Sequence, residues 1–596
     1  MLEQTLALIR GGSFLIQAID PEQVFTPEDF SEEQRMIGET AQQFMESEVF
    51  PRIEAIESKQ EGVNEQLLRK AAAIGLVAAG IPEQYGGEGL DQISITIISD
   101  KSGLYGSFAT TFGAHTGIGI LPILYFGTEQ QKSKYLPKLA TAEWIAAYAL
   151  TEAESGSDAL AAKTKAVLSS DGTHYILNGT KMWITNAAFA HVFITFAKVD
   201  GDKFSAFIVE RGFPGVNTGA EEHKMGIRGS STRTLILENA EVPVENVLGE
   251  IGRGHVIAFN ILNFGRFKLG ATAISGIKYV TNEAIRYARE RRQFGRAIID
   301  FGAIQHKVAE MAVRIYCAES MVYRTAGMMD TAMRAIDKSN PQAPAEILKA
   351  IEEYAIECSI IKVANSEILD FIVDEAVQIY GGYGYSQDYP VERCYRDARI
   401  NRIFEGTNEI NRLLITGMLL KRAMKGQLAL IPAAQKLANE ILSIPAFEVA
   451  DSGSLSTEKT LVANCKKIFL LAAGIAVQKY HEALSEQQEI LGLLSDLVIA
   501  IYAMESVLLR VQKTMNRSSE SRATLQIQAV QVTVHGILPE VENKAKQILA
   551  AVSEGDELRT QLAALRRFTK HTPINLIALR QAIARKLTEA GRYCIS

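Results

Sequence analysis

The stretch HVFITFAKVDGDKFSAFIVE, residues 191–210, contrasts with the helical patterns on either side of it. Two runs rich in β-branched and aromatic residues, His191–Lys198 and Phe204–Val209, flank the pair Asp200-Gly201. Runs of this composition around an Asp-Gly pair are typical of two strands joined by a tight turn. The stretch therefore predicts a β-hairpin and, with it, a β domain inside a mostly helical chain.

The strand-like sequence pattern continues outside this hairpin, and Tyr175–Gly179 is a further strand candidate. Apolar residues at helical spacing dominate on both sides, beginning with a capping signal at Ser31–Gln34. We expect a mostly α fold with a central β domain. Its parts are a helical N-terminal domain (1–140), the β domain (141–255), a C-terminal helical domain (256–425) and a helical extension (426–596).

The extension contains a segment that is similar in sequence to a segment of the domain before it. The segment IYCAESMVYR at Ile315–Arg324 corresponds to IYAMESVLLR at Ile501–Arg510, 186 positions later (315 against 501), and most apolar positions agree. Two explanations stay open: a decayed duplicate of the preceding domain, or a chance match between two amphipathic helices.

Composition excludes several classes of protein. The chain has 596 residues and a net charge of −7, which argues against a nucleic-acid partner. The five cysteines show no CxxC spacing, so neither a metal site nor a redox dithiol is supported, and a reducing compartment is expected. The longest apolar runs, such as Ile468–Val477, are too short to span a bilayer. The N-terminus lacks the pattern of a secretory signal or an organelle transit peptide.

Three polar segments lie in otherwise apolar surroundings: Tyr148–Asp158 (YALTEAESGSD), Lys181–Asn186 (KMWITN) and Arg399–Glu409 (RINRIFEGTNE). Taken singly, they fit a turn, a strand end and a link between helices. The glycine-rich segment Gly381–Tyr385 does not complete a GxGxxG motif and follows a helix, where a dinucleotide-binding loop follows a strand. Any nucleotide cofactor therefore needs another scaffold.

Together, the three segments resemble the acyl-CoA dehydrogenase family, from about Val24 to Leu420. The extension makes the chain most similar to the very-long-chain subgroup. The resemblance implies a helical N-terminal domain, a central β-barrel and a C-terminal four-helix bundle, with FAD between the last two. It also implies FAD-dependent α,β-dehydrogenation of fatty acyl-CoA thioesters to trans-2-enoyl-CoA, with electrons passed to electron-transferring flavoprotein. The smallest working unit implied is a homodimer, and a tetramer stays open.

The resemblance assigns the flavin contacts residue by residue. Thr151 bonds the pyrimidine edge, Trp183 packs on the isoalloxazine and the Thr185 hydroxyl faces flavin N5. Ser157 lies near the CoA moiety. The same flavin-lining segments include Tyr148, Leu150 and Ile184.

Further contacts implied by the resemblance lie elsewhere in the chain. Arg291, with Gln293 and Phe294 beside it, binds the FAD pyrophosphate of a neighbouring subunit. Gln378, Gly381 and Gly382 border the adenosine end, and Thr407 the pyrophosphate, with Glu409 in the same segment. Asn263 and Arg266 contact CoA.

The resemblance identifies Glu405 as the base that removes the substrate's α-proton. An apolar pocket is expected to raise its pKa, and Gly406 lets the backbone approach the ligand closely. Some relatives place the base immediately before the arginine that matches Arg266. That position is Gly265 here, which has no side chain, so Glu405 is the sole candidate.

Chain-length preference depends on Ala114, which stands where medium-chain relatives carry a bulky acidic residue at the pocket floor. A small residue there predicts long-chain substrates. Two rival functions stay open: an acyl-CoA oxidase that passes electrons to oxygen, and a non-catalytic assembly protein with the same fold. The chain departs from the common pattern at Ala153, where proline is usual.

The end of the extension is basic. Between Leu558 and Arg592 there are eight basic residues and one acid, with apolar residues at helical spacing. This pattern fits either a peripheral membrane contact or the solvated face of a packed helix. The extension favours a dimer by covering the face through which simpler relatives form tetramers. The expected location is the bacterial cytoplasm, or the mitochondrial matrix for a processed chain.

Overall fold

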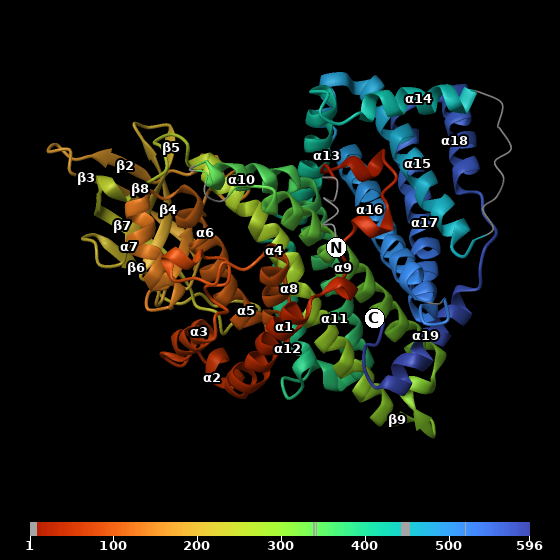
Figure 1. Ribbon diagram of the computed structural model, residues 1–596, viewed down its shortest axis with the longest axis horizontal. Coiled ribbons are helices and arrows are strands. Elements are labelled where there is room, and N and C mark those ends of the chain that lie inside the picture. Colours follow the sequence, from red (N-terminus) through yellow and green to blue (C-terminus); the bar gives the residue numbers. More distant parts are fainter. Residues whose placement is uncertain (1–8, 338–339, 341, 443–452, 519, 596) are drawn as a thin grey trace.

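The computed structural model describes residues 9–337, 340, 342–442, 453–518 and 520–595 (Figure 1). In Figure 1 the β domain lies at one end, the extension at the other, and long helices connect them. The mostly helical fold with a central β domain is therefore confirmed. The N-terminal helices are α1 (Glu32–Phe44), α2 (Ile53–Glu57), α3 (Val63–Ala73), α4 (Gln92–Ser102), α5 (Gly106–Gly113), the π-helical turn Ala114–Gly119, α6 (Leu121–Phe126) and α7 (Glu129–Ala140).

The first helix begins where the capping signal predicts. The Ser31 hydroxyl accepts a hydrogen bond from the Gln34 N–H at 3.1 Å, and the Gln34 side chain accepts one from the Ser31 N–H at 3.1 Å. These two bonds satisfy backbone donors that the first helical turn leaves free.

The β domain contains the predicted hairpin. Strand β4 (Val192–Val199) pairs antiparallel with β5 (Lys203–Glu210), and Val199 faces Lys203 across the turn. Asp200 and Gly201 have φ of 51° and 89°, a conformation that the Asp-Gly pair adopts readily. The other strands are β1 (Ala146–Ala149), β2 (Lys165–Leu168), β3 (His174–Thr185), β6 (Val216–Thr218), β7 (Thr232–Pro243) and β8 (Val247–Leu248).

The hydrogen-bonded strand order is β6-β7-β3-β2-β4-β5-β8, with β1 on β4. In the part of the chain described, the end strands β6 and β8 are not paired with each other. The predicted central β domain is therefore present, and the hydrogen-bonded path of its sheet ends at β6 and β8.

The next helices build the bundle. They are α8 (Gly254–Glu290), α9 (Gly302–Arg334), α10 (Ala343–Glu353), α11 (Ala355–Tyr380), α12 (Pro390–Ala398) and α13 (Asn408–Met424). A Cβ atom on Gly270 would lie 2.2 Å from the Ile361 side chain, so glycine is what allows α8 and α11 to pack closely. A short hairpin, β9 (Arg292–Gln293) and β10 (Arg296–Ala297), joins α8 to α9.

The extension adds α14 (Leu430–Leu442), α15 (Ser456–Tyr480), α16 (Gln488–Arg517), α17 (Thr524–Val552), α18 (Gly555–Thr569) and α19 (Leu576–Ala590). Its α16 packs against α9 and α13 of the bundle. Two helices, Ser456–Glu486 and Gln488–Arg517, are long and apolar enough to cross a membrane by length and composition, although no continuous apolar run reaches that length. Most of the apolar part of α16 is buried between other helices, as in the core of a globular domain.

The two similar segments, Ile315–Arg324 and Ile501–Arg510, contact each other. Arg324 of α9 pairs with Glu505 of α16 at 2.8 Å, and Arg510 of α16 pairs with Glu319 of α9 at 3.0 Å. All four side chains are buried. Because each pair is the other shifted by 186 positions, the two helices meet reciprocally, as two copies of one helix would. The guanidinium groups also lie over equivalent rings, Arg324 over Tyr502 at 4.4 Å and Arg510 over Tyr316 at 4.3 Å.

The basic segment at the end of the chain forms parts of α18 and α19. The apolar residues Leu565 and Phe568 of α18 are buried, and α18 packs against α15 and α17. Arg580 of α19 pairs with Glu310 of α9 at 2.6 Å. The apolar side of this segment is therefore occupied by protein, which favours the packed-helix interpretation over membrane contact.

Candidate active site

A large cavity of about 1540 Å³ lies between the N-terminal helices, the β domain and the bundle. Thr185 at the end of β3, Gly265 of α8 and Glu405 in the segment before α13 line one part of it. Ala114, at the start of the π-helical turn, lines it as well, together with apolar side chains of α4, α5, α6 and α10. The structure thus brings together residues from four separate predicted segments.

Glu405 has an unusual backbone and an isolated carboxylate. Its φ is 60°, and that of Gly406 is 80°, so the segment turns sharply just before α13. Its Oε2 atom is buried and has no hydrogen-bond partner among the described residues. Burial raises the pKa of Glu405 to about 7, while the charges of Arg266 and Lys362 act in the opposite direction. A carboxylate in this setting is a stronger base than one in water.

Backbone carbonyls of the Glu405 segment are held from two sides. The Asn411 side-chain amide donates to the carbonyl oxygens of Glu405, Gly406 and Thr407 at 3.3, 2.8 and 3.0 Å. Arg266 donates to the same Glu405 carbonyl at 3.3 Å and to Asn263 at 3.0 Å. Sequence reasoning missed Asn411, although an amide four residues after the cap residue Thr407 was a usable signal.

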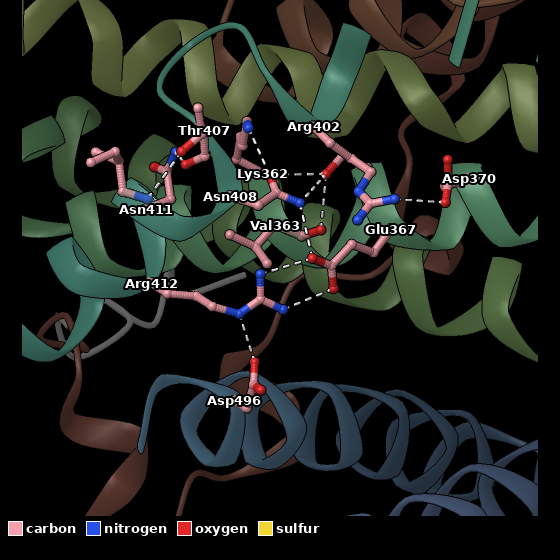
Figure 2. Close-up of polar contacts among 12 residues, drawn as sticks. Lys362, Val363, Glu367, Asp370, Arg402, Thr407, Asn408, Asn411, Arg412 and Asp496 are labelled. Carbon is pink, nitrogen blue, oxygen red and sulfur yellow. Dashed lines mark hydrogen bonds and ion pairs between the residues drawn. The ribbon is translucent and has the colours of Figure 1, made fainter. Parts of the chain in front are cut away.

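A second network includes Asn408, three residues after Glu405 (Figure 2). The ammonium of Lys362, on α11, donates to Asn408 at 2.6 Å, and Asn408 donates to Glu367 at 3.0 Å. Glu367 accepts two hydrogen bonds from Arg412, at 2.8 and 3.0 Å. Arg412 in turn donates to Asp496 of α16 at 2.7 Å. The extension is thus connected to the Glu405 segment through hydrogen bonds and ion pairs, which the sequence did not reveal.

Two of the polar segments adjoin each other in the β domain. The Met182 N–H donates to the Thr151 carbonyl at 2.8 Å, and the buried Lys181 pairs with Glu152 at 2.7 Å. Trp183 has φ of 61° and its side chain is 55% exposed, which is unusual for an indole on a strand. The hydroxyl of Tyr148 is buried without a hydrogen-bond partner. Leu150 and Ile184 are buried beside them, and Ser157 is exposed.

Models of the acyl-CoA dehydrogenase family match most of the chain: the N-terminal domain at 31–143, the middle domain at 147–240 and the C-terminal domain at 252–420. A second C-terminal domain model matches 464–567. A probable acyl-CoA dehydrogenase of Bacillus subtilis is 52% identical over 100% of both chains.

The chain belongs to the acyl-CoA dehydrogenase family. The rat mitochondrial very long-chain specific acyl-CoA dehydrogenase is 35% identical over 76% of this chain and 71% of that protein. The crystal structure of an acyl-CoA dehydrogenase complexed with FAD from Bacillus anthracis has a TM-score of 0.96 and 51% identity, covering 98% of this chain and 100% of that one.

FAD is the cofactor of this family, and the residues of this acyl-CoA dehydrogenase fit it. A flat ring needs an open aromatic surface and nearby donors, and the exposed Trp183 indole with Thr151 and Thr185 offers both. The unpartnered Tyr148 hydroxyl is a further polar group without a protein partner at this place. The Thr407 hydroxyl accepts a hydrogen bond from the Ile410 N–H as the cap of α13.

The other predicted cofactor residues of this acyl-CoA dehydrogenase form a separate group. The Arg291 guanidinium lies 5.4 Å from the ring of Tyr383, which places the hairpin after α8 beside the glycine turn after α11. Arg291, Gln293 and Phe294 are exposed, and Phe294 is 92% exposed. Gln378, Gly381 and Gly382 belong to the same end of the bundle. The 37 residues of α8 separate this end from the β domain by about 55 Å. One chain therefore does not bring the two groups into a single site.

Proposed function

We propose that this protein catalyses FAD-dependent α,β-dehydrogenation of long-chain fatty acyl-CoA thioesters to trans-2-enoyl-CoA, with Glu405 as the base. The observation that carries the proposal is the Glu405 carboxylate, which faces the cavity at Gly265 and has a buried oxygen without a hydrogen-bond partner. A carboxylate that was bonded to an arginine would be a weak base. Here Arg266 bonds the backbone carbonyl of Glu405 and leaves the carboxylate free.

Each group at the site has its own role in the reaction. Glu405 takes the α-hydrogen as a proton, and the α C–H electron pair forms the new double bond as the β-hydrogen leaves as hydride. Bound FAD supplies the acceptor for that hydride. The backbone N–H of Glu405 makes no hydrogen bond to another described residue, so it is available to donate to the thioester oxygen as negative charge develops there. The apolar cavity wall keeps water from the carboxylate.

The same geometry supports our proposals on chain length and assembly. Ala114 is small and lines the cavity, whose volume of about 1540 Å³ leaves room for a long acyl chain. The exposed Arg291 hairpin supports a homodimer in which it contacts the FAD of the partner subunit, because its own chain keeps it far from Trp183. We assign Gln378, Gly381 and Gly382 to the adenosine end of that same FAD, and Asn263 and Arg266 to CoA.

We propose electron-transferring flavoprotein as the electron acceptor and the bacterial cytoplasm as the location. The Bacillus subtilis relative, alike over its whole length, supports the bacterial setting. An oxidase would share the fold and the base but would pass the electrons to oxygen.

Anaerobic titration of the FAD-loaded enzyme with acyl-CoAs of increasing length tests the proposal. We expect long-chain substrates to reduce the flavin and bleach its absorbance. The flavin should stay reduced when air is admitted, and its absorbance should return when electron-transferring flavoprotein is added. Rapid recovery in air would identify an oxidase instead. If no acyl-CoA bleaches the flavin, the proposal is wrong and a non-catalytic assembly role is favoured.

A further inference from the structure

Lys268 is a cavity-lining lysine that the mechanism does not use. It lies on α8 three residues after Gly265, about one helical turn further along the same side of the helix. Part of its side chain is accessible, and the residue lines the cavity that also contains Glu405. It forms no ion pair with any carboxylate in the part of the chain that the structure describes.

One hydrogen bond holds the lysine. Its ammonium donates to the Thr116 hydroxyl oxygen at 2.5 Å, and that hydroxyl donates onward to the Phe112 carbonyl at 2.9 Å. The ammonium also lies 5.6 Å from the Phe112 ring centre. A Cβ on Gly117 would lie 3.6 Å from Nζ, so the lysine extends past the π-helical turn where that turn has no side chain. Of three donor hydrogens, one is used.

Nearby polar groups have partners of their own. The His115 ring is saturated, because its Nε2 contacts the Leu139 carbonyl at 3.1 Å and its Nδ1 accepts from the Ala146 N–H at 3.1 Å. Glu129, which also lines the cavity, pairs with Lys132 at 3.0 Å. Apolar side chains such as Phe112, Ala114 and Phe264 line the same cavity.

An ammonium in such a wall is unfavourable without an anion. Burial lowers the pKa of Lys268 to about 7, so its charged form is less stable in this wall than in water. A plain hydrocarbon chain would lie against this group without compensating it, and methionine would fill the same space at no such penalty. A carboxylate brought in by the ligand would restore the charge balance and use the free donors.

We infer that Lys268 and Thr116 form a subsite for a carboxylate at the far end of the acyl chain, so that the enzyme accepts ω-carboxyacyl-CoA thioesters. This inference rests on the proposed function, because the substrate is still an acyl-CoA dehydrogenated at Glu405. One turn of α8 separates Lys268 from Gly265, so the carboxylate lies several carbons beyond the reacting bond. The cavity contains further space for longer plain chains.

The test compares wild type, Lys268→Met and Lys268→Gln as FAD-loaded enzymes. Each is assayed with matched pairs of substrates, an acyl-CoA and the ω-carboxyacyl-CoA with the same number of carbons, from six to sixteen carbons. The quantity measured is the ratio of kcat/KM for the carboxylated substrate to that for the plain one. We expect both substitutions to lower this ratio by about tenfold or more at the best-matched length, because a charge-assisted hydrogen bond is lost. Plain substrates should be turned over at least as well as by wild type.

Lys132→Met is the matched control, because Lys132 lines the same cavity but is paired with Glu129. Its ratio should equal that of wild type. Equal ratios in wild type and both Lys268 variants at every length would overturn the inference while leaving the dehydrogenase intact. Failure of wild type to oxidise any acyl-CoA would instead contradict the proposed function.

Discussion

A Cβ atom on Gly265 would lie 2.4 Å from Oε2 of Glu405 and 2.7 Å from its carboxyl carbon. The carboxylate therefore lies directly on the backbone of α8, in the space that any side chain at position 265 would take. This contact explains in physical terms why a base on α8 and a base at 405 exclude each other. The absence of a side chain at 265 is a requirement for the position of the Glu405 carboxylate.

Gly265→Ala should displace the Glu405 carboxylate and lower kcat by about a hundredfold, since a shift of roughly 1 Å in a reacting group has an effect of that order. FAD binding, followed by the visible spectrum, should be unchanged. Gly417→Ala is the control, because Gly417 lies in α13 and an added Cβ would meet nothing within 4 Å. A Gly265→Ala enzyme with normal kcat would show that the contact is unimportant.

The activity should depend on pH through Glu405. Its pKa is raised to about 7 by burial, and only the deprotonated form is a base, so kcat/KM should rise as the pH rises through about 7. Lys362→Met removes a positive charge that lowers the pKa of Glu405, so the rise should move to higher pH. Lys362→Arg keeps the charge and should leave the midpoint closer to that of wild type. A lower rate with an unmoved midpoint would mean that Lys362 acts only as a structural support.

Ala114→Glu should shorten the preferred acyl chain. Ala114 is 7% exposed and lines the cavity, so the glutamate side chain would enter the space for the acyl tail. We expect kcat/KM for long chains to fall by about tenfold or more relative to medium chains, because a charged group would meet the apolar tail. The measurement is the kcat/KM profile over acyl chain length. An unchanged profile would remove Ala114 from the account of chain length.

We propose that the extension arose by duplication of the bundle domain. The reciprocal pairs Arg324–Glu505 and Arg510–Glu319 support this origin, as do the two C-terminal domain models that match different parts of the chain. Because both pairs are buried, Arg324→Met should reduce the free energy of unfolding by about 3 kcal/mol, the typical effect of removing one partner of a buried pair.

Arg559→Met is the control for that measurement, because the Arg559–Asp556 pair is almost fully exposed. It should change the urea midpoint hardly at all. If Arg324→Met is as stable as Arg559→Met, the reciprocal contacts do not hold the extension to the bundle.

Much of the fold was predictable from local patterns. The hairpin around Asp200-Gly201 and the capped start at Ser31 depend on neighbours in sequence, and both appear where expected. The order of the strands was not predictable, because it depends on the path of the whole sheet, which no local pattern determines.

The same distinction holds for the site. The role of Glu405 stays a prediction, made from the resemblance of its segment to the acyl-CoA dehydrogenase family. The supports of that segment were missed, because Lys362 and Asn411 are polar residues inside helical patterns, and only the packing of α11 against α13 shows that they are buried beside it. The hydrogen bond from Arg412 to Asp496 could not be predicted from any local pattern, because it joins the bundle to the extension.

The central claim is that Glu405 removes the α-proton. The most direct measurement is anaerobic addition of a long-chain acyl-CoA to FAD-loaded Glu405→Gln, with flavin absorbance followed in time against wild type. We predict that the variant binds FAD normally and that its flavin stays oxidised over the time in which wild type bleaches completely. Bleaching of the variant at a rate near that of wild type would contradict the account.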